Sequence, residues 1–148
     1  MPKSSGGEYL NKGTEIWVGD LTSKNPVTRR AALYALGEIG PPARSAASKV
    51  RRLLRDEESF VRLWAASALA KIEPEKKRNS IGPLRRGLKD QAAFVRSLAA
   101  SFLGLLGSEC AGIRGVLPAL EDCLTDADPS VREEAALAIK RIRHRQRG

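Results

Sequence analysis

The sequence predicts an all-α protein built from repeated helical pairs, and three observations lead to this prediction. A sixteen-residue segment recurs as NPVTRRAALYALGEIG (25–40), ESFVRLWAASALAKIE (58–73), AAFVRSLAASFLGLLG (92–107) and DPSVREEAALAIKRIR (128–143). Its fifth position is always arginine, and these arginines are 33, 34 and 36 residues apart. A shorter helical pattern precedes each copy. A period of this size indicates a stacked array, because one helical pair cannot bury its apolar face alone.

Each copy of the repeated segment predicts the second, longer helix of a pair. Positions 4, 8, 11, 12 and 15 are small or apolar, and this spacing places them on one buried face. In the second copy they are Val61, Ala65, Ala68, Leu69 and Ile72. Asn25 and Asp128 each precede a proline, which predicts a capped helix start. Gly40 and Gly107 stand where a helix would stop with a positive φ.

The first helix of each pair is predicted from the shorter patterns. AASKVRRLLRD (46–56), IGPLRRGLKD (81–90) and VLPALEDCLTD (116–126) all end on Leu-x-Asp, whereas EIWVGDLTSK (15–24) has Ser23 in place of the aspartate. We therefore expect four helix–turn–helix repeats, at about 8–40, 42–73, 78–107 and 112–145. Together they predict one domain over 8–145, preceded by a flexible lead (1–7) and followed by a basic tail end (146–148).

With these motifs the chain resembles the HEAT-repeat families, in particular the short bacterial HEAT-like repeats of the phycobilisome-lyase type. The segments DPSVREEAALAI (128–139) and VLPALEDCLTD (116–126) carry the resemblance, which covers nearly the whole chain. It implies a right-handed α-solenoid of about eight helices. It is specific for the fold and unspecific for function.

The composition of the chain limits the partners and the location that we expect for the protein. The 148 residues include 26 basic and 17 acidic side chains, a net charge of +9 that permits nucleic acid, an anionic membrane or an acidic protein as partner. No run approaches the roughly 20 apolar residues of a transmembrane helix, and the N-terminus lacks the apolar core of a secretory signal. We therefore expect a cytoplasmic protein.

The sequence contains few residues in patterns that are typical of catalytic sites. Cys110 and Cys123 fit no metal or redox spacing, and the single histidine, His144, lies in a basic tail. Aspartate and glutamate fall mainly at turns and caps, with no evident pair for general acid–base chemistry. We expect no catalytic residues, no metal and no cofactor.

The repeated arginines have two interpretations. Arg62, Arg96 and Arg132 each lie six residues after an aspartate, and Arg29 lies six residues after Ser23. A buried arginine needs a carboxylate partner, so an Asp–Arg ladder across the turn or between neighbouring repeats is one reading. A row of anion-binding arginines is the other.

A second basic pattern lies on the predicted first helices of repeats two and three. It comprises Arg51, Arg52, Arg55, Arg85, Arg86 and Lys89, which we call the basic ridge. It predicts either a surface for anions or an ordinary solvated face.

The predicted concave strip consists of residues at positions 6 and 10 of the repeated segment. They are Arg30, Tyr34, Leu63, Ser67, Ser97, Ser101, Glu133 and Leu137, with small residues at position 13 in three of the four copies. The strip fits a shallow docking surface for a protein or peptide, or merely close helix packing.

The resulting hypothesis is a non-catalytic scaffold that presents a solenoid surface to a protein partner. The alternative is a protein that binds nucleic acid or phosphate through the basic ridge and the basic C-terminal tail. Trp17 and Trp64 align with leucines in other repeats, so we expect both to be packing residues.

Overall fold

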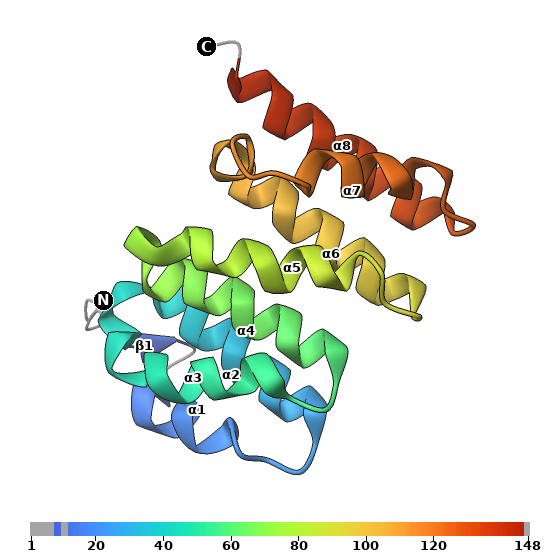
Figure 1. Cartoon of the computed structure of the whole chain (residues 1–148). Coiled ribbons are helices and arrows are strands. Elements are labelled where there is room, and N and C mark those ends of the chain that lie inside the picture. The colour runs from blue at the N-terminus through green and yellow to red at the C-terminus, as the bar shows by residue number, and fades with distance from the viewer. Residues whose placement is uncertain (1–7, 10–11, 147–148) are drawn as a thin grey trace. The chain divides into compact units, whose positions relative to one another are not determined.

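The computed structural model describes residues 8–9 and 12–146. Over this part of the chain it contains eight α-helices in four pairs (Figure 1). The pairs are α1 (Thr14–Asp20) with α2 (Pro26–Ile39), α3 (Ala47–Arg52) with α4 (Ser59–Ile72), α5 (Ile81–Gly87) with α6 (Ala93–Leu106), and α7 (Val116–Asp122) with α8 (Pro129–Gln146). The predicted all-α repeat architecture is confirmed.

Short 3-10 helices extend or connect the α-helices. They are η1 (Pro41–Ala46), η2 (Leu53–Arg55), η3 (Pro74–Ser80), η4 (Gly107–Cys110) and η5 (Cys123–Thr125). Before α1, the two-residue strands β1 (Glu8–Tyr9) and β2 (Lys12–Gly13) form a small antiparallel hairpin, where the sequence predicted only the start of the first repeat.

The chain divides into two compact units, Met1–Ser80 and Ile81–Gly148. The predicted single domain over 8–145 therefore stays a prediction. In the first unit α2 packs against α1 and α4, and α3 packs against α4. In the second unit α8 packs against α6 and α7, and α5 packs against α6. Each unit thus repeats the same helical packing.

The helix starts and stops follow the local sequence. The Asn25 side chain accepts a hydrogen bond from the Val27 N–H at 2.9 Å, and Asp128 accepts one from the Ser130 N–H at 2.9 Å. Gly40 and Gly107 have φ of +74° and +49°, so both adopt a conformation that favours glycine. These predicted boundaries are confirmed.

The predicted apolar face forms the core of each unit. In the first unit Val61, Ala65, Ala68 and Ile72 of α4 are buried, together with Trp17, while Leu69 and Trp64 are partly buried against the same cluster. In the second unit Leu103, Leu120, Val131 and Ile142 are fully buried. Trp17 is a core residue, as expected, whereas Trp64 is only half-buried.

Small residues let the second helices approach closely at equivalent places. A Cβ atom added to Gly37 of α2 would lie 3.4 Å from Ala68 Cα of α4. A Cβ atom added to Gly104 of α6 would lie 3.0 Å from Ala138 Cα of α8. Close helix packing, one of the two readings of the small residues, therefore accounts for glycine at position 13 of the segment.

One segment of the described chain, Ala93–Cys110, is long and apolar enough to cross a membrane, with a mean hydropathy of 1.2. Its buried residues, among them Val95, Ala99 and Leu103, are also those of a core helix. Length and composition therefore give only weak evidence of a membrane span.

Candidate interaction surfaces

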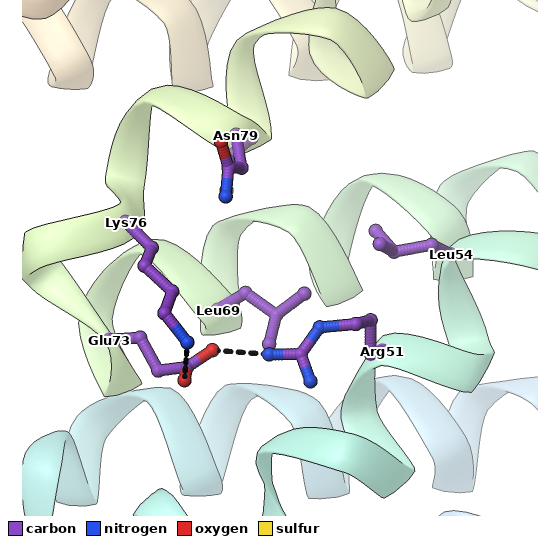
Figure 2. Close-up of a pocket in the computed structure, with 7 residues that line it drawn as sticks. Arg51, Leu54, Leu69, Glu73, Lys76 and Asn79 are labelled. Carbon is purple, nitrogen blue, oxygen red and sulfur yellow. Dashed lines mark hydrogen bonds and ion pairs between the residues drawn. The ribbon is translucent and has the colours of Figure 1, made fainter.

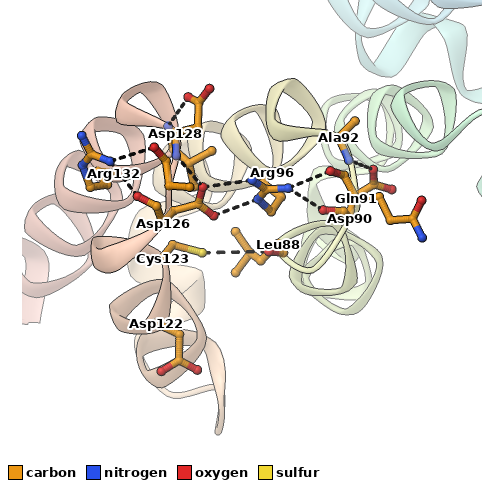
Figure 3. A network of polar contacts seen from close by, with 12 residues as sticks. Leu88, Asp90, Gln91, Ala92, Arg96, Asp122, Cys123, Asp126, Asp128 and Arg132 are labelled. Atoms are coloured by element: carbon orange, nitrogen blue, oxygen red, sulfur yellow. Dashed lines mark hydrogen bonds and ion pairs between the residues drawn. The ribbon is translucent and has the colours of Figure 1, made fainter.

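Two of the repeated arginines, Arg29 and Arg96, form ion pairs with the aspartate of the following repeat. Arg29 donates from Nε and Nη2 to the two carboxylate oxygens of Asp56, both at 2.9 Å, and only 8% and 6% of the two side chains are exposed. Arg96 makes the same bidentate pair with Asp126, at 2.8 and 2.9 Å (Figure 3). The hydrogen bonds that Arg29 donates to Asp56 raise the pKa of Arg29, which therefore stays charged despite its burial.

Within its own repeat, each arginine binds the backbone of the preceding turn. Nη1 donates to the carbonyl oxygen of the residue six places earlier, at 2.8, 2.6, 2.8 and 2.7 Å. The accepting residues are Ser23, Asp56, Asp90 and Asp126. These contacts refine the sequence interpretation. Across the turn, the arginine donates to the aspartate's backbone carbonyl. The carboxylate of Asp56 or Asp126 instead accepts from the arginine of the preceding repeat.

The same aspartates also shape the turns. The carboxylates of Asp56, Asp90 and Asp126 each accept the N–H two residues ahead, at 2.9–3.0 Å. The Ser23 hydroxyl accepts the Asn25 N–H at 3.2 Å in the same way. Arg29 and Arg96 are therefore structural residues.

In the first unit, the basic ridge is partly neutralised. Arg51 donates to the buried carboxylate of Glu73 at 2.6 Å. Arg52 and Arg55, on α3 and η2, are exposed, and neither is paired with a carboxylate of the described residues.

In the second unit, Arg85 donates to the carbonyl oxygen of Arg114 at 2.9 Å. Arg86 and Lys89 are exposed. The structure therefore gives local roles to Arg51 and Arg85 and leaves four ridge residues open to solvent. A continuous ridge of all six stays a prediction.

Only part of the predicted concave strip is exposed. Leu63 is 3% exposed, so its assignment to a docking surface was wrong. Ser67, Ser97 and Ser101 are half-buried, while Tyr34, Glu133 and Leu137 are exposed. Arg30 is half-buried with its guanidinium 5.8 Å from the ring centre of Trp64, which also makes an edge-to-face contact with Tyr34. In the first two copies, position 6 (Arg30 and Leu63) thus turns toward neighbouring side chains rather than outward.

The large apolar residues exposed on the second helices occupy positions 3, 10 and 14 of the repeated segment. Those of the second unit form what we call the second-helix row: Phe94 and Leu105 on α6, and Leu137 on α8. In the first unit, Val27 and Tyr34 of α2 are exposed at positions 3 and 10. Phe94 and Leu105 are 62% and 66% exposed and lie eleven residues, or about three turns, apart on one face of α6. Leu98 and Ser101 of the same face are half-buried.

Sequence reasoning missed most of this row, because it assigned positions 6, 10 and 13 to the outer face. The available signal was the recurrence of a large apolar residue at position 3 and its return at position 14 in the third copy. An apolar residue outside the predicted buried positions is the pattern that indicates an exposed apolar face.

A small pocket lies in the first unit beside Arg51. Its volume is about 180 Å³, and Arg51, Leu54, Leu69, Glu73, Lys76, Asn79 and Ser80 line it (Figure 2). Glu73 accepts from Arg51 at 2.6 Å and from Lys76 at 3.0 Å. These two hydrogen bonds, the one from Lys76 first, lower the pKa of Glu73.

Comparisons with known proteins agree with the repeat architecture. Residues 18–104 match the family model described as HEAT repeats, which is more than half of the chain. The chain belongs to the HEAT-repeat family. Residues 74–148 also match the model described as non-SMC mitotic condensation complex subunit 1. A search of curated proteins found no significant match.

Two solved structures of engineered proteins resemble these HEAT repeats. Both are crystal structures from the Northeast Structural Genomics Consortium, both are 27% identical to the chain, and both matches cover 88% of it. The TM-scores are 0.62 and 0.57. The chain spans 62% of the length of one structure and 38% of the other.

Over the described residues, no group of three or more His, Cys, Asp or Glu side chains could hold a metal ion. Cys110 and Cys123 are both buried free thiols. Burial raises the pKa of Cys110 to about 11, so this thiol is a poor nucleophile at neutral pH.

Proposed function

We propose that the protein is a non-catalytic scaffold that binds a protein partner through the second-helix row. The single observation that carries the proposal is the exposure of Phe94, Leu105 and Leu137 on the second helices of a repeat protein. Exposed apolar residues gathered on one helix face mark interaction sites, because leaving them in water costs free energy that a partner can recover.

The polar chemistry of the described residues supports a binding role over a catalytic one. Arg29, Arg96 and their aspartate partners are occupied in the ladder, and Arg51 and Arg85 have local partners. A general acid or base needs a positioned group beside a substrate cavity, and the ladder carboxylates instead accept hydrogen bonds from arginine and backbone. We place the protein in the cytoplasm, an expectation that rests on its sequence.

The test is to capture partners from the native host and then map the interface with variants. Leu105→Ser and Leu137→Ser should each weaken binding of a captured protein about tenfold or more, as expected of exposed apolar anchors. Leu124→Ser is the matched control, because Leu124 is 41% exposed on η5, outside the row. Partner binding that the row variants leave unchanged, or recovery of nucleic acid without any protein, would contradict the proposal.

A second function, binding of nucleic acid or phosphate, draws on a different observation. Arg52, Arg55, Arg86 and Lys89 are exposed, and the net charge is +9. Such charges attract any polyanion at low salt, whereas a specific site needs several phosphate contacts that survive at physiological salt. Because Arg51 is paired with Glu73, the ridge carries less net charge for a polyanion, which favours the protein-binding proposal.

A further inference from the structure

The pocket beside Glu73 combines buried charge with an apolar wall. Arg51 comes from α3, Leu54 from η2, Leu69 from α4, and Lys76 and Asn79 from η3, and Glu73 is the C-cap of α4, so four elements of the first unit enclose it. Leu54 and Leu69 supply apolar surface, and Asn79 extends its amide toward the same space (Figure 2). The pocket is thus amphipathic, as ligand sites generally are.

The charges of the lining do not cancel. Two cations, Arg51 and Lys76, face one acid, Glu73, which leaves a formal charge of 2 − 1 = +1 among the lining residues. Glu73 is 8% exposed in its side chain, whereas Arg51 and Lys76 are 46% and 55% exposed. The acid therefore lies beneath the two cations and holds them in place at the pocket mouth.

Both cations keep donors for a ligand. A guanidinium carries five N–H donors and an ammonium three, and one hydrogen bond from each goes to Glu73. Both side chains are about half exposed, so they remain accessible to a ligand from solvent. Glu73 preorganises them, so an incoming anion does not have to order two long side chains itself.

We propose that this pocket binds a carboxylate group of the protein partner, with an adjacent apolar side chain against Leu54 and Leu69. A residual charge of +1 matches one carboxylate better than a phosphate dianion, and the apolar wall matches a peptide better than a phosphodiester backbone. The proposal rests on the proposed function in that a protein supplies the carboxylate. The source is either an acidic side chain or a chain terminus.

The experiment titrates small probes into the ¹⁵N-labelled full chain and follows the Asn79 side-chain amide and the Arg51 Nε–H by NMR. N-acetyl-leucine presents a terminal carboxylate with an apolar side chain, and N-acetyl-aspartyl-leucinamide presents a side-chain carboxylate beside one. N-acetyl-leucinamide is the uncharged control, and inorganic phosphate tests the competing anion. We expect dissociation constants on the order of millimolar for a carboxylate probe and at least tenfold weaker binding of the control.

Three variants test the charge argument. Arg51→Met and Lys76→Met should each weaken carboxylate binding on the order of tenfold, because each removes one cation. Glu73→Gln should strengthen it by a similar factor, because the residual charge rises to +2. Arg44→Met is the matched control: Arg44 pairs with Glu75 at 2.7 Å in the same unit but outside the pocket. If Glu73→Gln does not fold, the two methionine variants decide the question.

Carboxylate probes that bind no better than N-acetyl-leucinamide, or phosphate that binds more tightly than either carboxylate, would overturn the proposal. The carboxylate probe that binds more tightly shows whether the carboxylate comes from a side chain or from a chain terminus. Because the probes are small molecules, the result is independent of partner capture and of the second-helix row. A failure here leaves the proposed function standing, and failure of the row variants leaves this pocket standing.

Discussion

At the scale of single residues, the Arg29–Asp56 pair should dominate stability among the ion pairs between described residues. Both side chains are nearly excluded from water, so Arg29→Met leaves the Asp56 carboxylate buried without its cation. We expect a loss of about 3 kcal/mol in the free energy of unfolding, measured by urea denaturation. Arg44→Met, at the exposed pair with Glu75, should cost less than about 1 kcal/mol. Equal losses in the two variants would contradict the structural role of the ladder.

The pH dependence of stability should report Glu73. Its pKa is lowered in the folded protein, first by the hydrogen bond from Lys76 and then by that from Arg51. A lowered pKa stabilises the fold above the unfolded value of about 4.3 and loses this contribution as pH falls through the folded pKa. We therefore expect the urea midpoint to decrease as the pH drops below about 4.3. In Glu73→Gln the midpoint should depend less steeply on pH. An unchanged slope would mean that Glu73 is not held by these two cations.

The thiol of Cys110 should be inert in the native protein. Cys110 is fully buried, its Sγ donates to the carbonyl oxygen of Leu103 at 3.5 Å, and burial raises its pKa to about 11. At pH 8 we expect slow reaction with a disulfide reagent such as DTNB in native buffer and rapid reaction in urea, because the thiolate is the reactive form. Cys110→Ser isolates Cys123 and shows which thiol any fast native phase belongs to.

At the scale of helices, Gly104 fixes how closely α6 and α8 approach. Because an added Cβ would lie 3.0 Å from Ala138 Cα, Gly104→Ala requires α8 to give way by a few tenths of an ångström. We expect it to cost about 1–3 kcal/mol, seen as a lower urea midpoint. Gly19→Ala is the control, since nothing lies within 4 Å of its added Cβ and alanine should stabilise that helix by about 0.5–1 kcal/mol. A neutral Gly104→Ala would show that the two helices adjust without cost.

The sequence predicts the buried side of the helices better than the exposed side. Val61, Ala65, Ala68 and Ile72 are buried as predicted, because burial against a single partner helix leaves a clear spacing of three and four. Each second helix, however, contacts helices on more than one side, which widens its buried arc. Leu63, on the edge of that arc, is therefore buried, and the true outer face is shifted toward positions 3 and 14.

The Asp–Arg ladder shows that the sequence also predicts the contacts of polar residues only in part. The six-residue spacing of aspartate and arginine is visible in the sequence, and it predicts a structural contact correctly. Spacing alone does not show that the Arg29 carboxylate partner is Asp56, 27 residues ahead, because that contact depends on how repeats stack. The pocket at Glu73 was missed for a related reason: it joins four elements whose residues carry no shared motif.

At the scale of the whole molecule, the residues that recur in every repeat and the residues that differ between repeats have different roles. The recurring residues form cores, caps and the ladder within each unit. The second-helix row, the exposed ridge residues and the Glu73 pocket are all features that differ from repeat to repeat. Function in such a protein is carried by the differences, because a residue that every repeat needs for folding is not free to recognise a partner.

Variants that lower the net charge of +9 at different places can separate the two candidate functions. General attraction to nucleic acid depends on total charge, whereas a phosphate site depends on where the charge lies. A ridge variant replaces Arg52, Arg55, Arg86 and Lys89 with alanine; a control variant replaces the exposed residues Lys24, Lys49, Arg114 and Arg141. Both variants have a net charge of 9 − 4 = +5.

If the protein is a protein-binding scaffold, both variants should weaken low-salt binding of labelled DNA and RNA equally. Binding by the unchanged protein should then vanish by about 200 mM salt, because few counterions are released by a surface without a built phosphate site. A built site predicts the opposite: binding persists at that salt, and only the ridge variant loses it, with a shallower slope of log affinity against log salt. Since the two variants carry the same charge, a difference between them locates the phosphate contacts on the ridge, and equality assigns the charge to general attraction.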